Sequence, residues 1–360
     1  MKISIILGTR PEIIKMSPII RECEKKGVDY FILHTGQHYS YNLDKVFFKE
    51  LELPEAKYNL DVGSGTHAEE TGKMLIGIEK ALLSEKPDIV LVEGDTNTVL
   101  AGALAASKLH LKVGHVEAGL RSYDRNMPEE INRILVDHVS DYLFTPTEKA
   151  KENLLREGIS IDKIFVTGNT IVDAVYQNLE IARPKSRILN ELELKEKEYL
   201  LVTTHREENV DNKKRLEGIL KGLKSVCEGD DFAGIFPIHP RTEKRIKEFG
   251  LQVPEAVRLI EPLGYLDFLK LEVNARLILT DSGGIQEEAC ILGVPCVTLR
   301  DNTERPETLE VGSNVLVGAD AERVLKGAKF MLERKNNWIN PFGDGRAGKR
   351  IIKILEGVFD

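Results

Sequence analysis

The sequence contains no apolar run that approaches the roughly 18 to 20 residues needed for a membrane-spanning helix. Its first residues, MKISIILGTRPE, pass from a short apolar stretch straight into polar residues and offer no small-residue cleavage site. We therefore expect neither secretion nor membrane attachment, and we predict a cytoplasmic protein.

Positive charge is also in deficit. The 50 Lys and Arg residues face 58 Asp and Glu residues, which gives a formal charge of −8 at pH 7. The overall charge of such a chain does not attract nucleic acid or anionic lipid. We expect no nucleic-acid partner and no membrane partner, and any phosphate-binding site must be local.

Cysteine is scarce, with four residues in 360 and no Cys-x-x-Cys pair. This scatter indicates neither a zinc cluster nor a disulfide framework, and it favours reduced thiols packed in the core. The histidines also lack the HExxH or cysteine company of a zinc site, so we expect no metal. The four cysteines are Cys23, Cys227, Cys290 and Cys296.

What the sequence does contain is a repeated alternation of short apolar runs with helical patterns, which favours parallel sheets covered by helices. A chain of 360 residues is long enough for about two cores. We predict an α/β protein with two doubly wound, Rossmann-like domains, 1–170 and 171–345, whose parallel sheets face a central cleft where the ligand binds. The predicted strands and the residues that close them are 2–7, 31–35, 88–95, 112–119, 142–146, 163–169, 199–205, 234–239, 257–263, 276–284, 295–301 and 314–318.

Polar side chains collect where these apolar runs stop, as expected of ligand sites in such sheets. Ordinary turn and capping chemistry explains any one of these clusters equally well, but it explains their joint occurrence less well. The clusters are 8–12, 94–97, 115–121, 205–209, 239–241 and 281–288.

The segment Asp281-Ser282-Gly283-Gly284 precedes a helical pattern and predicts an anion site. Small residues at a helix start leave backbone N–H groups free, and the helix dipole adds positive potential. A simple N-cap would need only Ser or Asp, without two consecutive glycines. Glu287, one turn later, could accept hydrogen bonds from both ribose hydroxyls, so we expect a nucleoside diphosphate as the ligand.

The sequence lacks both the GxGxxG fingerprint and the GxxxxGK[ST] loop, which disfavours hydride transfer and phosphoryl transfer. Arg10 and Lys15 instead bring positive charge to the end of the first strand, where both could reach a phosphate or a leaving group. For Lys15 a solvated position on a helix is the alternative.

Asp95, Glu117 and Glu129 lie at or just after strand ends of the first domain, and His205 opens a loop of the second. Carboxylates beside a histidine suit proton abstraction from carbon, because crowding and burial raise the pKa of a carboxylate towards the working pH. For Glu129 and Glu130 the alternative is favourable charge in the first turn of a helix.

The chain resembles the non-hydrolysing UDP-N-acetylglucosamine 2-epimerase family through seven motifs that follow one another in order over almost its whole length. The motifs are GTRPEIIKMSP (8–18), TGQH (35–38), EGDT (93–96), HVEAGLRS (115–122), MPEEINR (127–133), HREEN (205–209) and DSGGIQEEA (281–289). The resemblance implies the two-domain GT-B-like fold of many glycosyltransferases, with the last segment, 346–360, returning to the first domain as a helix. It also implies a homodimer.

The activity implied by this resemblance is reversible epimerisation at C2 of UDP-N-acetylglucosamine to UDP-N-acetylmannosamine. The reaction eliminates UDP to give 2-acetamidoglucal and then adds UDP back, without a redox cofactor, and it supplies a precursor for surface polysaccharide or glycan synthesis. The resemblance implies that Asp95, Glu117, Glu129 and His205 are catalytic, with no acid or base role assigned to any one of them. It implies substrate and UDP binding for Arg10, Lys15, Arg206, Asn209, Phe268, Ser282, Gly283, Gly284, Glu287 and Arg305, with Phe268 in the segment that holds the uracil.

Two segments, 37–42 and 205–210, depart from the commoner bacterial pattern at positions that neighbour an activating nucleotide-sugar site in bacterial members. The resemblance therefore leaves allosteric activation open. Three alternative functions also stay open. They are a hydrolysing epimerase that releases free N-acetylmannosamine, a GT-B glycosyltransferase, and a nucleotide-sugar-binding protein without catalysis.

Overall fold

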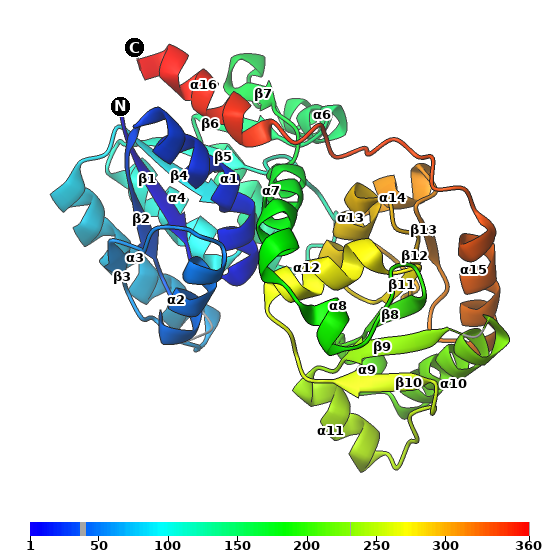
Figure 1. The fold of residues 1–360 in the computed structure, drawn as a ribbon. Helices are drawn as coiled ribbons and strands as arrows, with labels where there is room; N and C mark the ends of the chain where they lie inside the picture. Colours follow the sequence, from blue (N-terminus) through cyan, green and yellow to red (C-terminus); the bar gives the residue numbers. More distant parts are fainter. Residues whose placement is uncertain (37–40, 231, 360) are drawn as a thin grey trace. The chain divides into compact units, whose positions relative to one another are not determined.

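The computed structural model describes residues 1–36, 41–230 and 232–359 of the chain. The chain divides into two compact units (Figure 1). Unit 1 is Met1–Gln177 with Phe342–Asp360, and unit 2 is Asn178–Pro341. Each unit is built around one parallel sheet, so the prediction of two doubly wound α/β domains is confirmed.

The sheet of unit 1 has seven strands in the order β3-β2-β1-β4-β5-β6-β7, and every neighbouring pair is parallel. The central strands are continuous apolar runs because helices cover both faces of the sheet. The strands are β1 (Lys2–Leu7), β2 (Asp29–His34), β3 (Tyr58–Asn59), β4 (Ile89–Glu93), β5 (Lys112–Val116), β6 (Tyr142–Thr145) and β7 (Ile164–Val166). Within the described ranges of unit 1, the two-residue strand β3 alone has no counterpart among the predicted strands.

Local sequence signals set the limits of the helices in unit 1. Helix α1 has Pro11 in its first turn and ends at Gly27, whose φ of 68° suits glycine. Helix α3 begins with the capping box of Thr66 and Glu69. The helices are α1 (Arg10–Lys26), α2 (Tyr41–Glu50), α3 (His67–Glu85), α4 (Asn97–Lys108), α5 (Pro128–Val139), α6 (Glu148–Arg156), the 3₁₀ turn η1 (Ile161–Lys163), α7 (Thr170–Lys185), which continues into unit 2, and α16 (Ala347–Phe359).

The last helix, α16, packs against α1, so both ends of the chain belong to unit 1 (Figure 1). The Asp173 carboxylate of α7 accepts hydrogen bonds from the backbone N–H groups of Ala347 and Gly348, both at 3.0 Å, and so caps α16. A Cβ at Gly348 would lie 3.1 Å from the backbone of Pro18, so this glycine permits the close approach of the two helices.

The sheet of unit 2 has six parallel strands in the order β10-β9-β8-β11-β12-β13. The strands are β8 (Tyr199–Thr203), β9 (Ala233–Pro237), β10 (Val257–Ile260), β11 (Leu277–Thr280), β12 (Cys296–Thr298) and β13 (Asn314–Leu316). The helices are α8 (Ile188–Glu191), α9 (Glu207–Val210), α10 (Lys213–Asp230), α11 (Pro240–Glu248), α12 (Tyr265–Asn274), α13 (Gly283–Leu292), α14 (Pro306–Glu310) and α15 (Ala321–Glu333).

Apolar side chains fill the space between each sheet and its helices. All four cysteines are buried and free, as predicted. In the part of the chain that the structure describes, no helix has both the length and the apolar character required to cross a bilayer.

The strand order reverses between β1 and β4 in unit 1 and between β8 and β11 in unit 2. Adjacent loops run in opposite directions at such a point and leave a crevice beyond the carboxyl ends of the strands. The loops after these four strands and after β5, together with the first turns of the helices that follow them, hold most of the predicted site residues.

Candidate functional site

The carboxyl edge of unit 1 places an ammonium group between two buried carboxyl groups. Lys15 of α1 lies 3.2 Å, Nζ to Oε1, from Glu93 at the end of β4, and it donates to Oε2 of Glu117, just after β5. Both glutamates are buried. Burial raises the pKa of Glu93 well above its usual range, against the opposing charge of Lys15, and its hydrogen bond with Glu117 acts in the same direction as burial. Lys15 is therefore held by carboxyl groups and is not a solvated helix charge.

The backbone of Glu117 is in the left-handed region, with φ of 69°. This conformation is costly for a residue with a side chain and is found most often at functional sites. Gly119, two residues later, also has a positive φ, and a Cβ there would lie 2.3 Å from the carbonyl oxygen of Ala150. The loop after β5 is therefore held in one unusual shape that points the Glu117 side chain at Lys15.

Asp95 follows β4 and pairs with Arg133 of α5, whose Nη2 lies 2.5 Å from Oδ2. The same guanidinium donates to Glu130 at 2.9 Å. The carboxylate of Asp95 keeps some exposure to solvent, which leaves it accessible to a ligand. Arg133 is the positive group that balances the two acids.

The two neighbouring glutamates at the start of α5 differ in environment. Glu130 is buried and accepts hydrogen bonds from the backbone N–H groups of Ser122 and Tyr123, both at 2.9 Å. Burial alone would raise the pKa of Glu130, but these donors and Arg133 hold it below its usual value. Glu129 is exposed in the first helical turn. The buried member of the pair thus fastens the loop at 122–123.

Glu12 joins two of the loops at this edge. Its carboxyl group accepts hydrogen bonds from the backbone N–H groups of Gly8 at 2.5 Å and Thr9 at 3.2 Å, and from the hydroxyl of Thr96. Burial raises the pKa of Glu12 to about 7, although these donors oppose the shift and Asp95 adds to it. The loops after β1 and β4 therefore meet through one buried carboxyl group.

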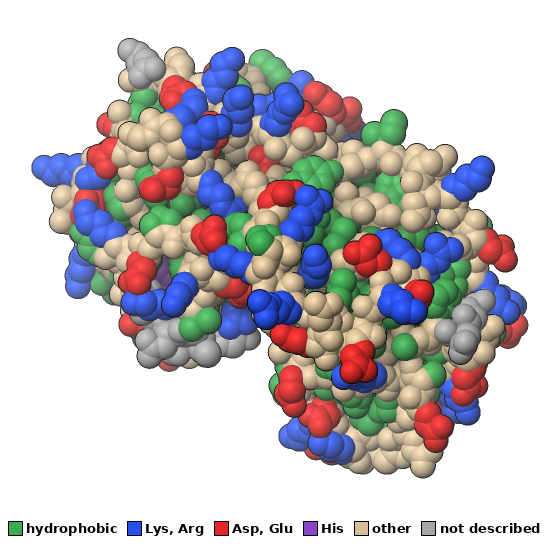
Figure 2. All heavy atoms as spheres, viewed as in Figure 1, with side chains coloured by type: hydrophobic (Ala, Val, Ile, Leu, Met, Phe, Trp, Pro, Cys, Tyr) green, Lys and Arg blue, Asp and Glu red, His purple; other side chains and the backbone are tan. Residues whose placement is uncertain are grey.

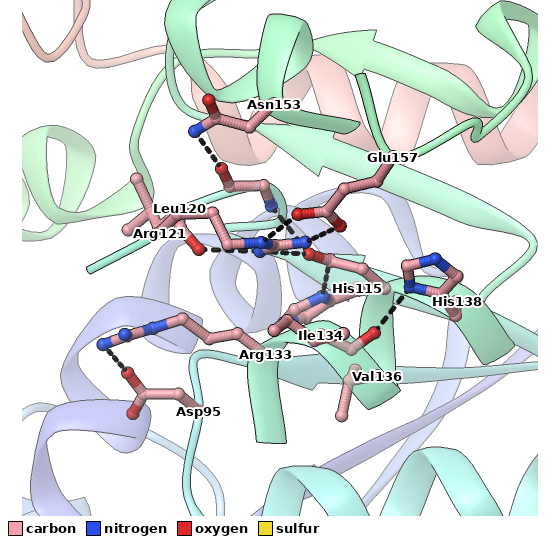
Figure 3. Close-up of polar contacts among 12 residues, drawn as sticks. Asp95, His115, Leu120, Arg121, Arg133, Ile134, Val136, His138, Asn153 and Glu157 are labelled. Carbon is pink, nitrogen blue, oxygen red and sulfur yellow. Dashed lines mark hydrogen bonds and ion pairs between the residues drawn. The ribbon is translucent and has the colours of Figure 1, made fainter. Parts of the chain in front are cut away.

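A buried ion-pair network fixes the segment that carries Glu117. His115 bonds to Asp137 at 2.7 Å through Nδ1 and to the carbonyl oxygen of Gly94 at 2.9 Å through Nε2. Arg121 reaches Asp137 with Nη1 at 2.7 Å and holds Glu157 with two nitrogens, at 2.7 and 2.6 Å. Figure 3 shows His115, Arg121 and Glu157 gathered in this way, with the Asp95–Arg133 pair nearby. His115 and Arg121 are thus fully engaged in holding the loop.

In unit 2, one carboxylate organises the loop after β8. Asp281 follows β11, is completely buried, and accepts hydrogen bonds from the hydroxyl of Thr204 at 2.6 Å and from the backbone N–H groups of His205 and Arg206 at 3.1 Å. It also accepts from Nδ2 of Asn209 at 3.0 Å. Asp281 therefore sets the position of three predicted site residues, His205, Arg206 and Asn209.

Asn209 is buried inside this network and does not face solvent. Besides Asp281, its Nδ2 donates to the carbonyl oxygen of Leu299 at 2.8 Å, and its Oδ1 accepts from Nε of Arg215 at 3.0 Å. Its amide atoms thus link β8, β11 and β12 within the protein.

The imidazole of His205 is about half exposed, 3.5 Å from Asp281 and with its ring centre 6.0 Å from that of His239. Desolvation, together with the positive charges of His239 and Arg206, lowers the pKa of His205, while Asp281 opposes the shift. A histidine of this kind is neutral near pH 7 and can accept a proton.

Neither the backbone conformation nor the packing around the start of α13 requires glycine at positions 283 and 284. Neither Gly283 nor Gly284 has a positive φ. A Cβ would come no closer than 3.6 Å to another residue at Gly283, and at Gly284 it would meet only the Ser282 hydroxyl oxygen at 4.0 Å. Free space around an N-terminal turn with bare N–H groups is what a phosphate needs for close approach.

Three further predicted binding residues lie on the elements that flank α13 or within that helix. Arg305, before α14, lies 2.8 Å from Glu287 of α13, Nε to Oε1, so the structure brings these two together. Glu304 beside them is an anion, since two hydrogen bonds from Arg300 at 2.8 Å lower the pKa of Glu304 to about 2. Phe268 of α12 packs partly buried on the core of unit 2.

Arg10 is the most exposed of the predicted cations of unit 1, and its guanidinium lies over the ring of Phe47 at 5.7 Å. Gln37 and His38 of the TGQH motif lie outside the described residues. Basic and acidic side chains are interspersed on the face that Figure 2 shows. Among the described residues, no group of three or more His, Cys, Asp or Glu side chains is placed to hold a metal ion.

The sequence reading did not single out Glu12, Glu93, Arg133 or Asp137. Glu93 carried a signal, because a charged residue closes an otherwise apolar strand and precedes Gly94 and Asp95. Glu12 also carried one, as the fourth residue of a Thr-x-x-Glu capping box. Nothing local marks Arg133 and Asp137, because their partners are far away in the sequence.

Comparison with known proteins identifies close relatives of this chain. A family profile described as UDP-N-acetylglucosamine 2-epimerase matches residues 21–356. A protein of Methanocaldococcus jannaschii named UDP-N-acetylglucosamine 2-epimerase is 64% identical over 362 residues, which cover 99% of each chain. One of the same name from Methanococcus maripaludis is 57% identical over 362 residues, which cover 99% of this chain and 98% of the relative.

A solved structure agrees with these sequence matches. The crystal structure of the Methanocaldococcus jannaschii UDP-GlcNAc 2-epimerase in complex with UDP-GlcNAc and UDP superposes with a TM-score of 0.88 at 64% identity. The match covers 99% of this chain and 100% of that one. The resemblance noted from the motifs is confirmed.

Proposed function

The chain belongs to the UDP-N-acetylglucosamine 2-epimerase family, and we propose that it interconverts UDP-N-acetylglucosamine and UDP-N-acetylmannosamine without releasing the free sugar. The relative from Methanocaldococcus jannaschii, crystallised with UDP-GlcNAc and UDP, supports the ligand class. The product would supply a precursor for surface polysaccharide or glycan synthesis.

One observation carries the chemistry. Two carboxyl groups at the carboxyl edge of unit 1, Asp95 and Glu117, are each held by a cation, Arg133 and Lys15 respectively. A carboxylate fixed in this way can take a proton and return it without a change in its own position. The left-handed backbone of Glu117 adds the strain expected of a functional residue.

The proposed reaction begins with removal of the proton at C2 by one of these groups. The electron pair of the C2–H bond forms the second bond of the C1–C2 double bond. The C1–O bond breaks, and UDP leaves with the electron pair of the C1–O bond. The intermediate is 2-acetamidoglucal. Protonation of C2 from the opposite face and return of UDP to C1 give the epimer, so carbon undergoes no net oxidation and no redox cofactor is needed.

The reaction needs proton-transfer groups for both faces of C2. We propose Asp95, Glu117, Glu129 and His205 for this task and assign no one of them to a face. Glu129 is exposed, which permits contact with a ligand, and the lowered pKa of His205 suits a proton acceptor.

The leaving diphosphate needs positive potential. We propose that the backbone N–H groups of Gly283 and Gly284, the hydroxyl of Ser282, and the cations Arg10 and Arg206 supply it. Glu287 and Arg305 would contact the ribose end of the nucleotide, and Phe268 the uracil. Lys15 acts on Glu117 in this proposal, because its ammonium is engaged by carboxyl groups. Asn209 acts by holding Asp281.

Incubation of the protein with UDP-N-acetylglucosamine in deuterated water, without an acceptor, tests this function. We expect both UDP-sugars, each with deuterium at C2. Free N-acetylmannosamine with stoichiometric UDP would identify a hydrolysing enzyme, and an unchanged substrate would refute the proposal. The exposed variant Glu152→Gln, in α6 of unit 1, is the matched control and should behave as the wild type.

The oligomeric state is a separate proposal. The resemblance implies a homodimer, and light scattering on the purified protein tests it. A mass of one chain at micromolar concentration would contradict it.

A further inference from the structure

Glu93 is a deeply buried carboxyl group at the carboxyl edge of unit 1, and the mechanism above does not use it. It lies at the last position of β4, with Lys15 3.2 Å from its Oε1 and Glu117 hydrogen-bonded to its carboxyl group. The charged groups that face it are Lys15 and Glu12 from α1 and Glu117 after β5. Glu93 thus contacts the proposed catalytic carboxylate of Glu117 from within the protein.

The net charge of the cluster formed by Lys15, Glu93 and Glu117 determines how many of its carboxyl groups stay protonated. Two ionised carboxylates with one ammonium would leave a net negative charge in a buried place, at a high cost in desolvation. Two carboxyl groups in contact cannot both ionise easily, so one of them keeps its proton. One shared proton makes the cluster of Lys15, Glu93 and Glu117 neutral.

The geometry indicates which carboxyl group holds that proton. The Lys15 ammonium lies closer to Glu117 than to Glu93, and the closer partner of a cation is the one that stays ionised. Glu117 also sits on a strained loop, whereas Glu93 lies on a regular strand. Glu117 is therefore the anion, and Glu93 is the hydrogen-bond donor to it.

We propose that Glu93 is a positioning residue that holds a proton and donates a hydrogen bond to Glu117, so that Glu117 stays ionised and oriented for proton transfer at the sugar. This inference rests on the proposed function for its kinetic consequence but not for the shared proton itself. Two variants separate the ability of residue 93 to ionise from its ability to donate a hydrogen bond. Glu93→Gln keeps a donor and an acceptor and cannot ionise, and Glu93→Leu keeps the approximate volume and removes both.

The kinetic prediction is a contrast between these variants. Glu93→Gln should retain kcat within about threefold of the wild type, since its amide still donates to Glu117 and its oxygen still lies beside the Lys15 ammonium. Glu93→Leu should lower kcat by about 10- to 100-fold, the effect of one lost hydrogen bond to a charged group, with KM changed less than about threefold. Loss of the donor raises the pKa of Glu117, so the acid limb of the pH profile should move to higher pH.

An infrared difference spectrum tests the shared proton without turnover. The wild type should show, near neutral pH, the C=O stretch of a protonated carboxylic acid that Glu93→Gln lacks. If the wild type shows no such band relative to Glu93→Gln, Glu93 is ionised and the inference is overturned. Equal loss of kcat in both variants, or none in Glu93→Leu, also overturns it. An inactive wild type that shows the band would refute the proposed function and leave the proton assignment intact.

Discussion

Replacement of Asp281 by Asn should destabilise unit 2 by about 2–5 kcal/mol. The carboxylate accepts four hydrogen bonds in a fully buried position, from the side chains of Thr204 and Asn209 and from the backbone N–H groups of His205 and Arg206. The amide oxygen of Asn can accept about two of them, and its NH₂ group faces donors. Each donor left unpaired in a buried place costs about 1–3 kcal/mol, and the loss of the negative charge weakens the bonds that remain.

Urea unfolding followed by tryptophan fluorescence measures the stability of unit 2, which contains Asp281. Trp338 is the only tryptophan of the chain, and in unit 2 its Nε1 donates to the carbonyl oxygen of Cys290 at 2.9 Å. The matched control is Thr204→Val, which removes one donor and leaves the carboxylate its other three, and should cost about 1 kcal/mol. If Asp281→Asn unfolds within about 0.5 kcal/mol of the wild type, or no earlier than Thr204→Val, the view of Asp281 as the organiser of this loop is wrong.

Three further changes test other parts of the structure. Asp95→Asn should lower kcat by about 100-fold or more, because the substitution removes a proton-transfer group. UDP affinity, measured by calorimetry, should change less than about threefold. Equal losses of kcat and of UDP affinity would argue against a catalytic role. Arg121→Met should reduce the free energy of unfolding by about 3–5 kcal/mol in circular-dichroism urea titrations, because it leaves the buried carboxylate of Asp137 without its arginine partner. The exposed Arg156→Met should cost under about 0.5 kcal/mol, and similar costs for the two variants would refute the network. Burial raises the pKa of Glu12 from 4.5 to about 7, so between these pH values the folded protein keeps a proton that the unfolded chain has lost, and the free energy of unfolding should fall by on the order of 3 kcal/mol as pH rises through that window. Glu12→Gln should remove this part of the pH dependence, and an unchanged pH dependence in urea titrations would count against it.

The strands and helices were predictable because their signals are local. The apolar runs that predict β1, β4 and β5 are buried strands, and the glycine and capping residues around α1 and α3 stand where those helices begin and end. Strand β3 escaped prediction because two residues carry no periodic pattern. Parallel sheets follow from the alternation of strands and helices, since parallel neighbours need a crossover connection.

The candidate site was predictable only in outline. Polar residues at strand ends indicated the right edge of each sheet, and two glycines before α13 indicated space for an anion. The local pattern did not show that Asn209 is buried within its own domain. Nor did it separate Glu129, which is exposed, from its neighbour Glu130, which is buried, since both stand in the first turn of the same helix.

The sequence by itself determined the class of fold, the edges where polar chemistry gathers and the family to which the chain belongs. Only the tertiary structure decided which side chains meet. Lys15 and Glu117 are 102 positions apart, yet they form a buried pair because β1, β4 and β5 are adjacent strands with their carboxyl ends at one edge. Strand order and register set such contacts, and neither is encoded in any short stretch of residues. The protonation of the buried acids follows from those contacts, because it depends on desolvation and on charges brought together from distant parts of the chain.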